Sequence, residues 1–94
     1  MPIALLTLHI KIPGCSSLKE KRSRLKPLLT RLHREFNISV AEMDHNDAWG
    51  EAVIACVIVS NDHKHVQRAL QNILHWVESS WPDVFVVNDK FEII

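Results

Sequence analysis

The feature that most constrains the fold of this chain is an unbroken apolar run of seven residues, Val-Ile-Ala-Cys-Val-Ile-Val, at positions 53–59. The run is far shorter than the roughly 18 residues that a membrane-spanning helix needs. A strand that is apolar on both sides lies in the middle of a sheet, because both of its faces need cover. We therefore expect a central strand over about residues 49–59, in a protein that does not enter a membrane.

The segments around this run predict five further elements. Residues 3–12 alternate apolar and polar side chains with period two, which indicates a strand. Ser17 and Glu20 have the Ser-x-x-Glu spacing of a capping box, which marks a helix start. The apolar stripe of this helix follows helical spacing. Its predicted members are Leu18, Leu25, Leu29, Leu32 and Phe36.

The second half of the chain repeats the pattern. Residues 38–44 and 84–94 predict two more strands, and a second helix starts after residues 60–62 and stops before Pro82. The order βαββαβ indicates a ferredoxin-like α+β plait, because two right-handed β-α-β units then share one antiparallel sheet. We expect a single domain over residues 1–94, with strand order 4-1-3-2 and both helices on one face of the sheet.

The opposite sheet face has no helix of its own in this topology. Two apolar sets compete for it: either Val53, Ala55, Val57 and Val59, or Ala52, Ile54, Cys56 and Ile58. Since exposed contiguous apolar surface usually marks an interface, we expect a homodimer through the open sheet face or an edge strand. The alternative is that alanines together with Thr7, His9 and Lys11 make this face polar enough for a monomer.

Charge is unevenly distributed along the chain. The formal net charge is zero, but residues 1–34 carry +7 and residues 35–94 carry −7. Most of the positive charge lies on the first helix, which therefore offers a cationic surface to RNA or to a ribosomal surface. The alternative is a solvated helix that pairs with the acids of the other half. The candidate anion-binding residues are Ser16, Ser17, Lys19, Lys21, Arg22, Arg24, Lys26, Arg31 and Arg34.

Catalytic and metal sites are poorly supported. Asp44 and His45 are weak candidate metal ligands in the second hairpin, and no cofactor is expected. Cys15, near a helix start, has no third group to complete a catalytic arrangement, and Cys56 reads as a small buried hydrophobe. Two unmatched thiols fit a reducing compartment, so we expect a cytoplasmic protein.

The tryptophans have two interpretations as well. Trp49 starts the third strand, and Trp81 precedes Pro82 at the same end of the predicted sheet. Both rings are suited to base stacking, but tryptophans so placed more often close the end of a small core.

Several segments together resemble the YlxP-like family, the domain of unknown function 503. They are Ile12-Pro13-Gly14, the segment Ser17-Leu18-Lys19-Glu20-Lys21-Arg22, residues 36–42, Asp44-His45, Trp49 and Val59-Ser60-Asn61-Asp62. The resemblance covers essentially the whole chain and implies a bacterial cytoplasmic protein with a ferredoxin-like fold. The family has no established activity or catalytic residues to carry over to this chain. Its association with genes of translation and ribosome maturation favours RNA or ribosome partners.

Three hypotheses follow. The first is a non-enzymatic module that binds RNA or a ribosomal precursor through the basic first helix. The second is a dimeric assembly factor whose basic helix meets an acidic protein surface. The third, which is less favoured, is an enzyme or metalloprotein at Cys15, Asp44 and His45.

Overall fold

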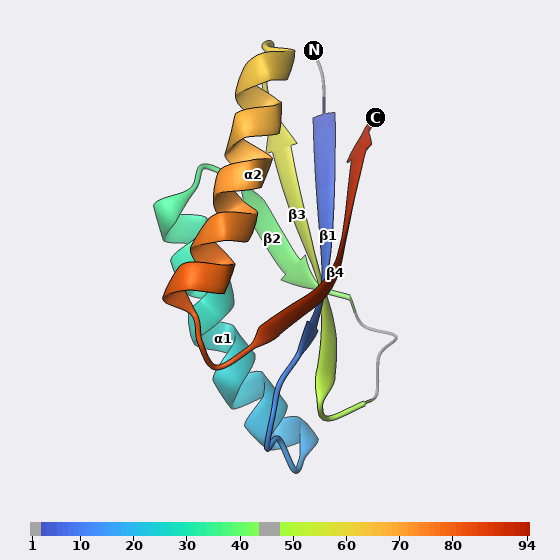
Figure 1. Ribbon diagram of the computed structural model, residues 1–94, viewed down its shortest axis with the longest axis vertical. Coiled ribbons are helices and arrows are strands. Elements are labelled where there is room, and N and C mark those ends of the chain that lie inside the picture. Colours follow the sequence, from blue (N-terminus) through green and yellow to red (C-terminus); the bar gives the residue numbers. More distant parts are fainter. Residues whose placement is uncertain (1–2, 44–47) are drawn as a thin grey trace.

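The computed structural model describes residues 3–43 and 48–94, and it contains all six expected elements (Figure 1). Their bounds are β1 Ile3–Lys11, α1 Leu18–Glu35, β2 Ser39–Glu42, β3 Glu51–Val59, α2 His63–Ser80 and β4 Phe85–Ile93. The four strands form one antiparallel sheet in the order β2-β3-β1-β4. This is the predicted order read from the opposite edge, so the ferredoxin-like α+β plait is confirmed.

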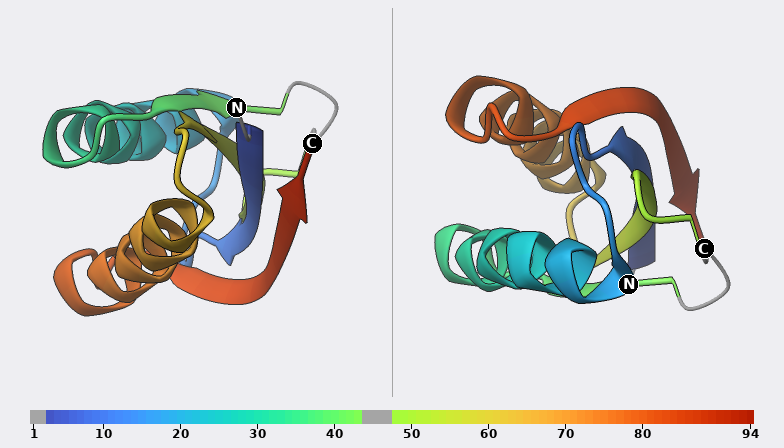
Figure 2. Two further views of the ribbon diagram at one scale, coloured as in Figure 1. Left: turned by 90° about the horizontal axis from the view of Figure 1, so that it is seen from above. Right: turned by 90° about the horizontal axis from the view of Figure 1, so that it is seen from below.

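Both helices lie on one side of the sheet (Figure 2), and they decide which face of β3 is buried. Ala52, Ile54, Cys56 and Ile58 are at most 4% exposed and belong to the core. On the other face of β3, Val53, Ala55 and Val57 are half-buried, and Val59 is 57% exposed. Of the two alternatives for the open face, the structure thus selects the set that begins with Val53.

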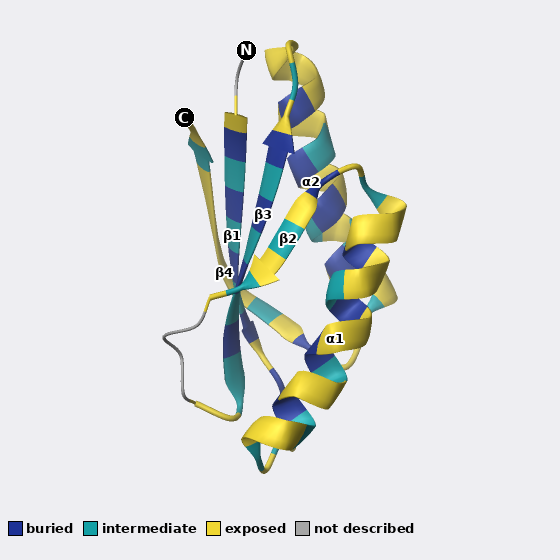
Figure 3. Cartoon of the chain, turned by 180° about the vertical axis from the view of Figure 1, so that it is seen from behind, coloured by how far each residue is buried: buried dark blue, intermediate teal, exposed yellow. Residues whose placement is uncertain are grey.

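The buried stripe of α1 differs from the predicted one. Its buried residues are Lys21, Leu25, Leu28 and Leu32, and they alternate along the helix with exposed positions (Figure 3). Leu18 is 39% exposed and Leu29 only packs against the core from the side. In the first turn the buried position is occupied by Lys21, one turn before Leu25, and not by Leu18 as the apolar stripe predicts.

The two cysteines are free thiols with different surroundings. Cys56 is fully buried on β3, where desolvation raises the pKa of its thiol to about 12. Cys15 is half-buried before α1, and its Sγ lies 3.4 Å from the carbonyl oxygen of Ser17. The interpretation of Cys56 as a core hydrophobe is confirmed.

Neither α1 nor α2 combines the length and apolar character that a membrane-spanning helix requires, within residues 3–43 and 48–94.

Candidate nucleic-acid interface

The start of α1 carries the predicted serine cap, but the reciprocal bond involves a different serine. The Glu20 N–H donates to Ser17 Oγ at 3.0 Å, as a capping box requires. The Glu20 carboxylate instead accepts from the N–H and the hydroxyl of Ser16, both at 2.8 Å. The backbone bond from Ser16, followed by the hydroxyl bond, lowers the pKa of the Glu20 carboxyl below its ordinary value.

This arrangement places a carboxylate of the chain itself at the helix start, where the sequence predicts that Ser16 and Ser17 bind an anion. The first turn of a helix attracts anions through its unpaired N–H groups and the positive end of its dipole. Glu20 already supplies that negative charge, and it engages Ser16 directly. Ser16 and Ser17 therefore complete the helix start, and the candidate interface lies further along α1.

Lys21 is not part of the exposed basic surface, contrary to its expected role. Only 2% of its side chain is exposed, and its Nζ lies 3.1 Å from Glu42 Oε2 on β2. The same Nζ donates to the carbonyl oxygen of Ala48 at 3.0 Å. The aliphatic stem of Lys21 thus fills a core position while its ammonium links α1 to β2 and to the residue before Trp49.

Arg24 and Arg31 occupy the flank of α1 that faces α2, and both have partners within the chain. Arg24 donates through Nη1 to the carbonyl oxygen of Pro13 and through Nη2 to that of Asp83, the latter at 2.9 Å. Its guanidinium therefore links the loop before α1 to the loop after α2. Arg31 pairs with Glu35 at 3.5 Å, and its guanidinium lies 5.9 Å from the ring centre of Trp76.

The other cations of α1 form what we call the outer basic face. They are exposed, and within the described residues they have no ion pair or hydrogen bond from their side chains. Lys19, Arg22 and Lys26 are spaced i, i+3, i+7 along the helix. They therefore share one side of it and span about 10 Å. The members of this face are Lys19, Arg22, Lys26 and Arg34.

A shallow hollow of about 460 Å³ lies on the solvent side of α1 beside this face. It forms around Pro27, which lies inside the helix and has no N–H to donate to the carbonyl of Ser23. The hollow is lined by Ser23, Lys26, Pro27, Thr30 and Arg31.

Trp81 and Trp49 differ in their exposure. Trp81 is half-buried, and its ring centre lies 6.0 Å from that of Trp76, which in turn meets Phe36 edge-on at 6.0 Å. Trp81 therefore helps to close the core between the two helices. Trp49 is 52% exposed, and it follows Ala48, which Lys21 holds against α1.

The described residues form no metal centre of three or more ligands. Asp44 and His45 lie outside them. Within residues 3–43 and 48–94, no three His, Cys, Asp or Glu side chains come close enough together to hold a metal ion.

The His33 side chain has a structural contact. Its Nδ1 lies 2.8 Å from the carbonyl oxygen of Ile38, which fastens the end of α1 to the start of β2.

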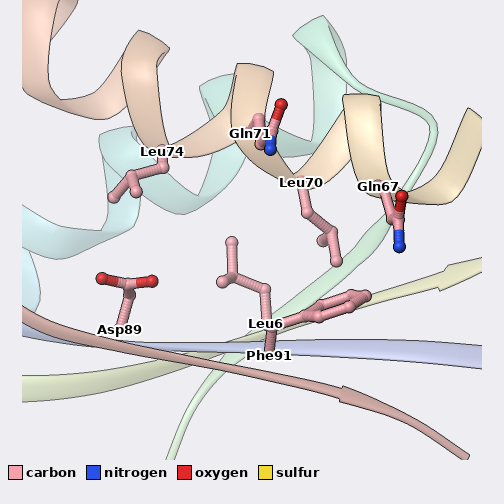
Figure 4. Close-up of a pocket in the computed structure, with 7 residues that line it drawn as sticks. All are labelled: Leu6, Gln67, Leu70, Gln71, Leu74, Asp89 and Phe91. Carbon is pink, nitrogen blue, oxygen red and sulfur yellow. The ribbon is translucent and has the colours of Figure 1, made fainter. Parts of the chain in front are cut away.

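One cavity was not anticipated from the sequence. It has a volume of about 380 Å³ and lies between α2 and β4 (Figure 4). Phe91 lies on β4, an edge strand of the sheet, and it is 40% exposed. The signal in the sequence was the spacing of Phe91 and Ile93, two residues apart, because this spacing puts both side chains on one face of the last predicted strand. The lining residues are Leu6, Gln67, Leu70, Gln71, Leu74, Asp89 and Phe91.

Comparisons with known proteins agree with the resemblance noted from the motifs. Over 73 residues the chain is 35% identical to the "Uncharacterized protein YlxP" of Bacillus subtilis (strain 168), which covers 78% of each protein. The crystal structure of SnoaB, a cofactor-independent oxygenase from Streptomyces nogalater, aligns with 99% of this chain and 90% of its own. Its TM-score of 0.47 and 11% identity are too low to support any conclusion about activity. Residues 3–89 match the family described as "Protein of unknown function (DUF503)", and the chain therefore belongs to the DUF503 family.

Proposed function

We propose that this protein is a non-enzymatic binding module whose outer basic face on α1 binds RNA. The RNA would be part of a ribosome or of a ribosomal precursor. The observation that carries the proposal is that Lys19, Arg22, Lys26 and Arg34 stand exposed on one helix with no ion pair among the described residues. The expected cytoplasmic location accords with such a partner.

The arrangement of these cations suits a phosphate backbone better than a small ligand. Lys19 and Lys26 are two helical turns apart with Arg22 between them, so successive phosphates can be contacted along one line. Glu42 pairs with Lys21 and Glu35 pairs with Arg31, whereas no acid among the described residues pairs with the cations of the outer basic face. Contacts of this kind position a nucleic acid without reading its bases. Base stacking on the exposed ring of Trp49 adds affinity for unpaired nucleotides.

The proposal is tested by measuring the affinity for a structured ribosomal RNA fragment as a function of salt concentration. Each phosphate contact contributes about 0.7–0.9 to the slope of log K against log salt. We expect the double variant Lys19→Met/Lys26→Met to lower that slope by about 1.5, since two contacts are lost. The matched control is Lys64→Met, because Lys64 is also exposed but lies on α2.

Two outcomes contradict the proposal. One is an affinity of the unaltered protein that does not change with salt. The other is a double variant whose slope equals that of the Lys64→Met control.

A pull-down from cell extract before and after nuclease treatment separates RNA from an acidic protein surface as the partner. Loss of the captured material after nuclease treatment supports RNA. Its retention favours the alternative of an assembly factor that uses the same helix on an acidic protein.

A further inference from the structure

The geometry points to a second copy of this chain as the occupant of the open sheet face. In this arrangement two sheets pack face to face about a two-fold axis, and both α1 helices point outward. The inference does not depend on RNA binding, because α1, which carries the outer basic face, lies on the helical side of the sheet (Figure 2).

The centre of the open face is apolar across three neighbouring strands. The register pairs Leu5 with Val57, and Thr7 with Ala55, between β1 and β3. Ala55 is in turn paired with Ala41 of β2. These small and aliphatic side chains form the kind of patch that is found at the core of protein interfaces.

Apolar exposure extends to both ends of this patch. At one end Ile3 and its register partner Val59 are 38% and 57% exposed. At the other end Phe85, which is paired with Lys11 in the register of β1 and β4, is 59% exposed. Burial of this surface would add apolar contacts that a 94-residue domain, with its small core, needs for stability.

The charges on the rim of the face identify the partner. Lys90 lies 3.3 Å from Glu92, and His9 lies 3.7 Å from Glu51, which is also the register partner of Lys11. Among the described residues, acids and bases therefore balance on this face. A nucleic acid or an acidic protein would need an excess of cations, whereas a balanced rim around an apolar centre is complementary to a rotated copy of itself.

The size of the face is sufficient for a dimer. Four strands about 4.8 Å apart, the longest of nine residues, cover roughly 500 Å² in projection. Each partner in a specific complex buries about 600–1,000 Å² of accessible surface, which exceeds the projected area because side chains make the surface rough. The row of Ala41, Ala55 and Thr7 lets two sheets approach to the usual separation of about 10 Å.

The test is the molecular mass in solution, measured by sedimentation equilibrium and by light scattering over a wide range of protein concentrations. We expect twice the 10.8 kDa of one chain for the unaltered protein. We expect a folded monomer for Ala55→Arg, because a guanidinium would be buried in the centre of the interface without a partner. The matched control Asn72→Arg, on the exposed side of α2, is expected to stay dimeric.

A second variant and a second measurement decide the question if Ala55→Arg does not fold. Leu5→Ala only truncates a half-buried side chain, and we expect it to weaken the dimer at least tenfold, since two copies of the contact are lost. The midpoint of thermal unfolding of the unaltered protein is expected to rise with protein concentration. A mass of 10.8 kDa at all concentrations overturns the inference. So does an unchanged dimer in both variants, which would place the interface elsewhere, such as the outer edge of β4.

Discussion

At the scale of the residue, α1 shows that charge alone does not determine exposure. Lys21 and Lys26 belong to the same helix, but Lys21 is 2% exposed and paired with Glu42, whereas Lys26 is exposed. The long stem of a lysine can fill an apolar position provided that its ammonium finds an acceptor. The acceptors for Lys21 come from β2 and from Ala48, so only the folded chain brings them together.

The Glu20 carboxylate provides a prediction about pH. Its pKa is lowered in the folded protein, so the unfolded chain binds more protons near pH 4 and stability rises with pH there. The contribution of Glu20 is present above the pKa of the unfolded state and is lost as the pH falls through the lowered pKa. We therefore expect Glu20→Gln to reduce the free energy of unfolding at pH 7, and the difference from the unaltered protein to shrink below about pH 4.

Urea unfolding at a series of pH values measures this difference. A difference that stays constant from neutral to acidic pH would show that the charge of Glu20 does not stabilise the helix start.

At the scale of the element, α1 continues from Leu18 to Glu35 through Pro27. A proline inside a helix is about 3 kcal/mol less favourable than alanine, because it lacks the N–H and its ring crowds the preceding turn. Pro27 is exposed, so its replacement removes little packing. The helix must therefore be held by its buried face, which Leu25, Leu28 and Leu32 anchor to the core.

We predict that Pro27→Ala raises the free energy of unfolding by about 1–3 kcal/mol, since it restores the bond to the Ser23 carbonyl. Denaturant unfolding with Thr30→Ala as the control measures the effect, because Thr30 is exposed on the same helix and its replacement is worth about 0.5 kcal/mol. A loss of stability in Pro27→Ala would mean that the backbone of α1 requires the proline geometry.

At the scale of the whole molecule, the sheet order predicts an uneven distribution of stability. β1 and β3 are bonded on both edges, whereas β2 and β4 each have one outer edge. Amides of the central strands exchange only through large-scale unfolding, while those of an edge strand exchange through local opening. We expect hydrogen exchange to be slowest in β1 and β3 and fastest in the four residues of β2.

Hydrogen–deuterium exchange followed by mass spectrometry resolves these segments. Equal protection of β1 and β2 would contradict the prediction, and dimerisation through the sheet face leaves the ranking unchanged because it bonds no strand edge.

The order of the elements, the strand order and the central place of residues 53–59 could all be predicted from the sequence. These properties follow from local periodicity and from chain connectivity, and both can be read directly from the amino-acid sequence. Only the folded chain shows which face of β3 is covered and that Lys21 is buried. The physical reason is that a run apolar on both faces suits either orientation, and a charged side chain is placed by partners distant in sequence, such as Glu42.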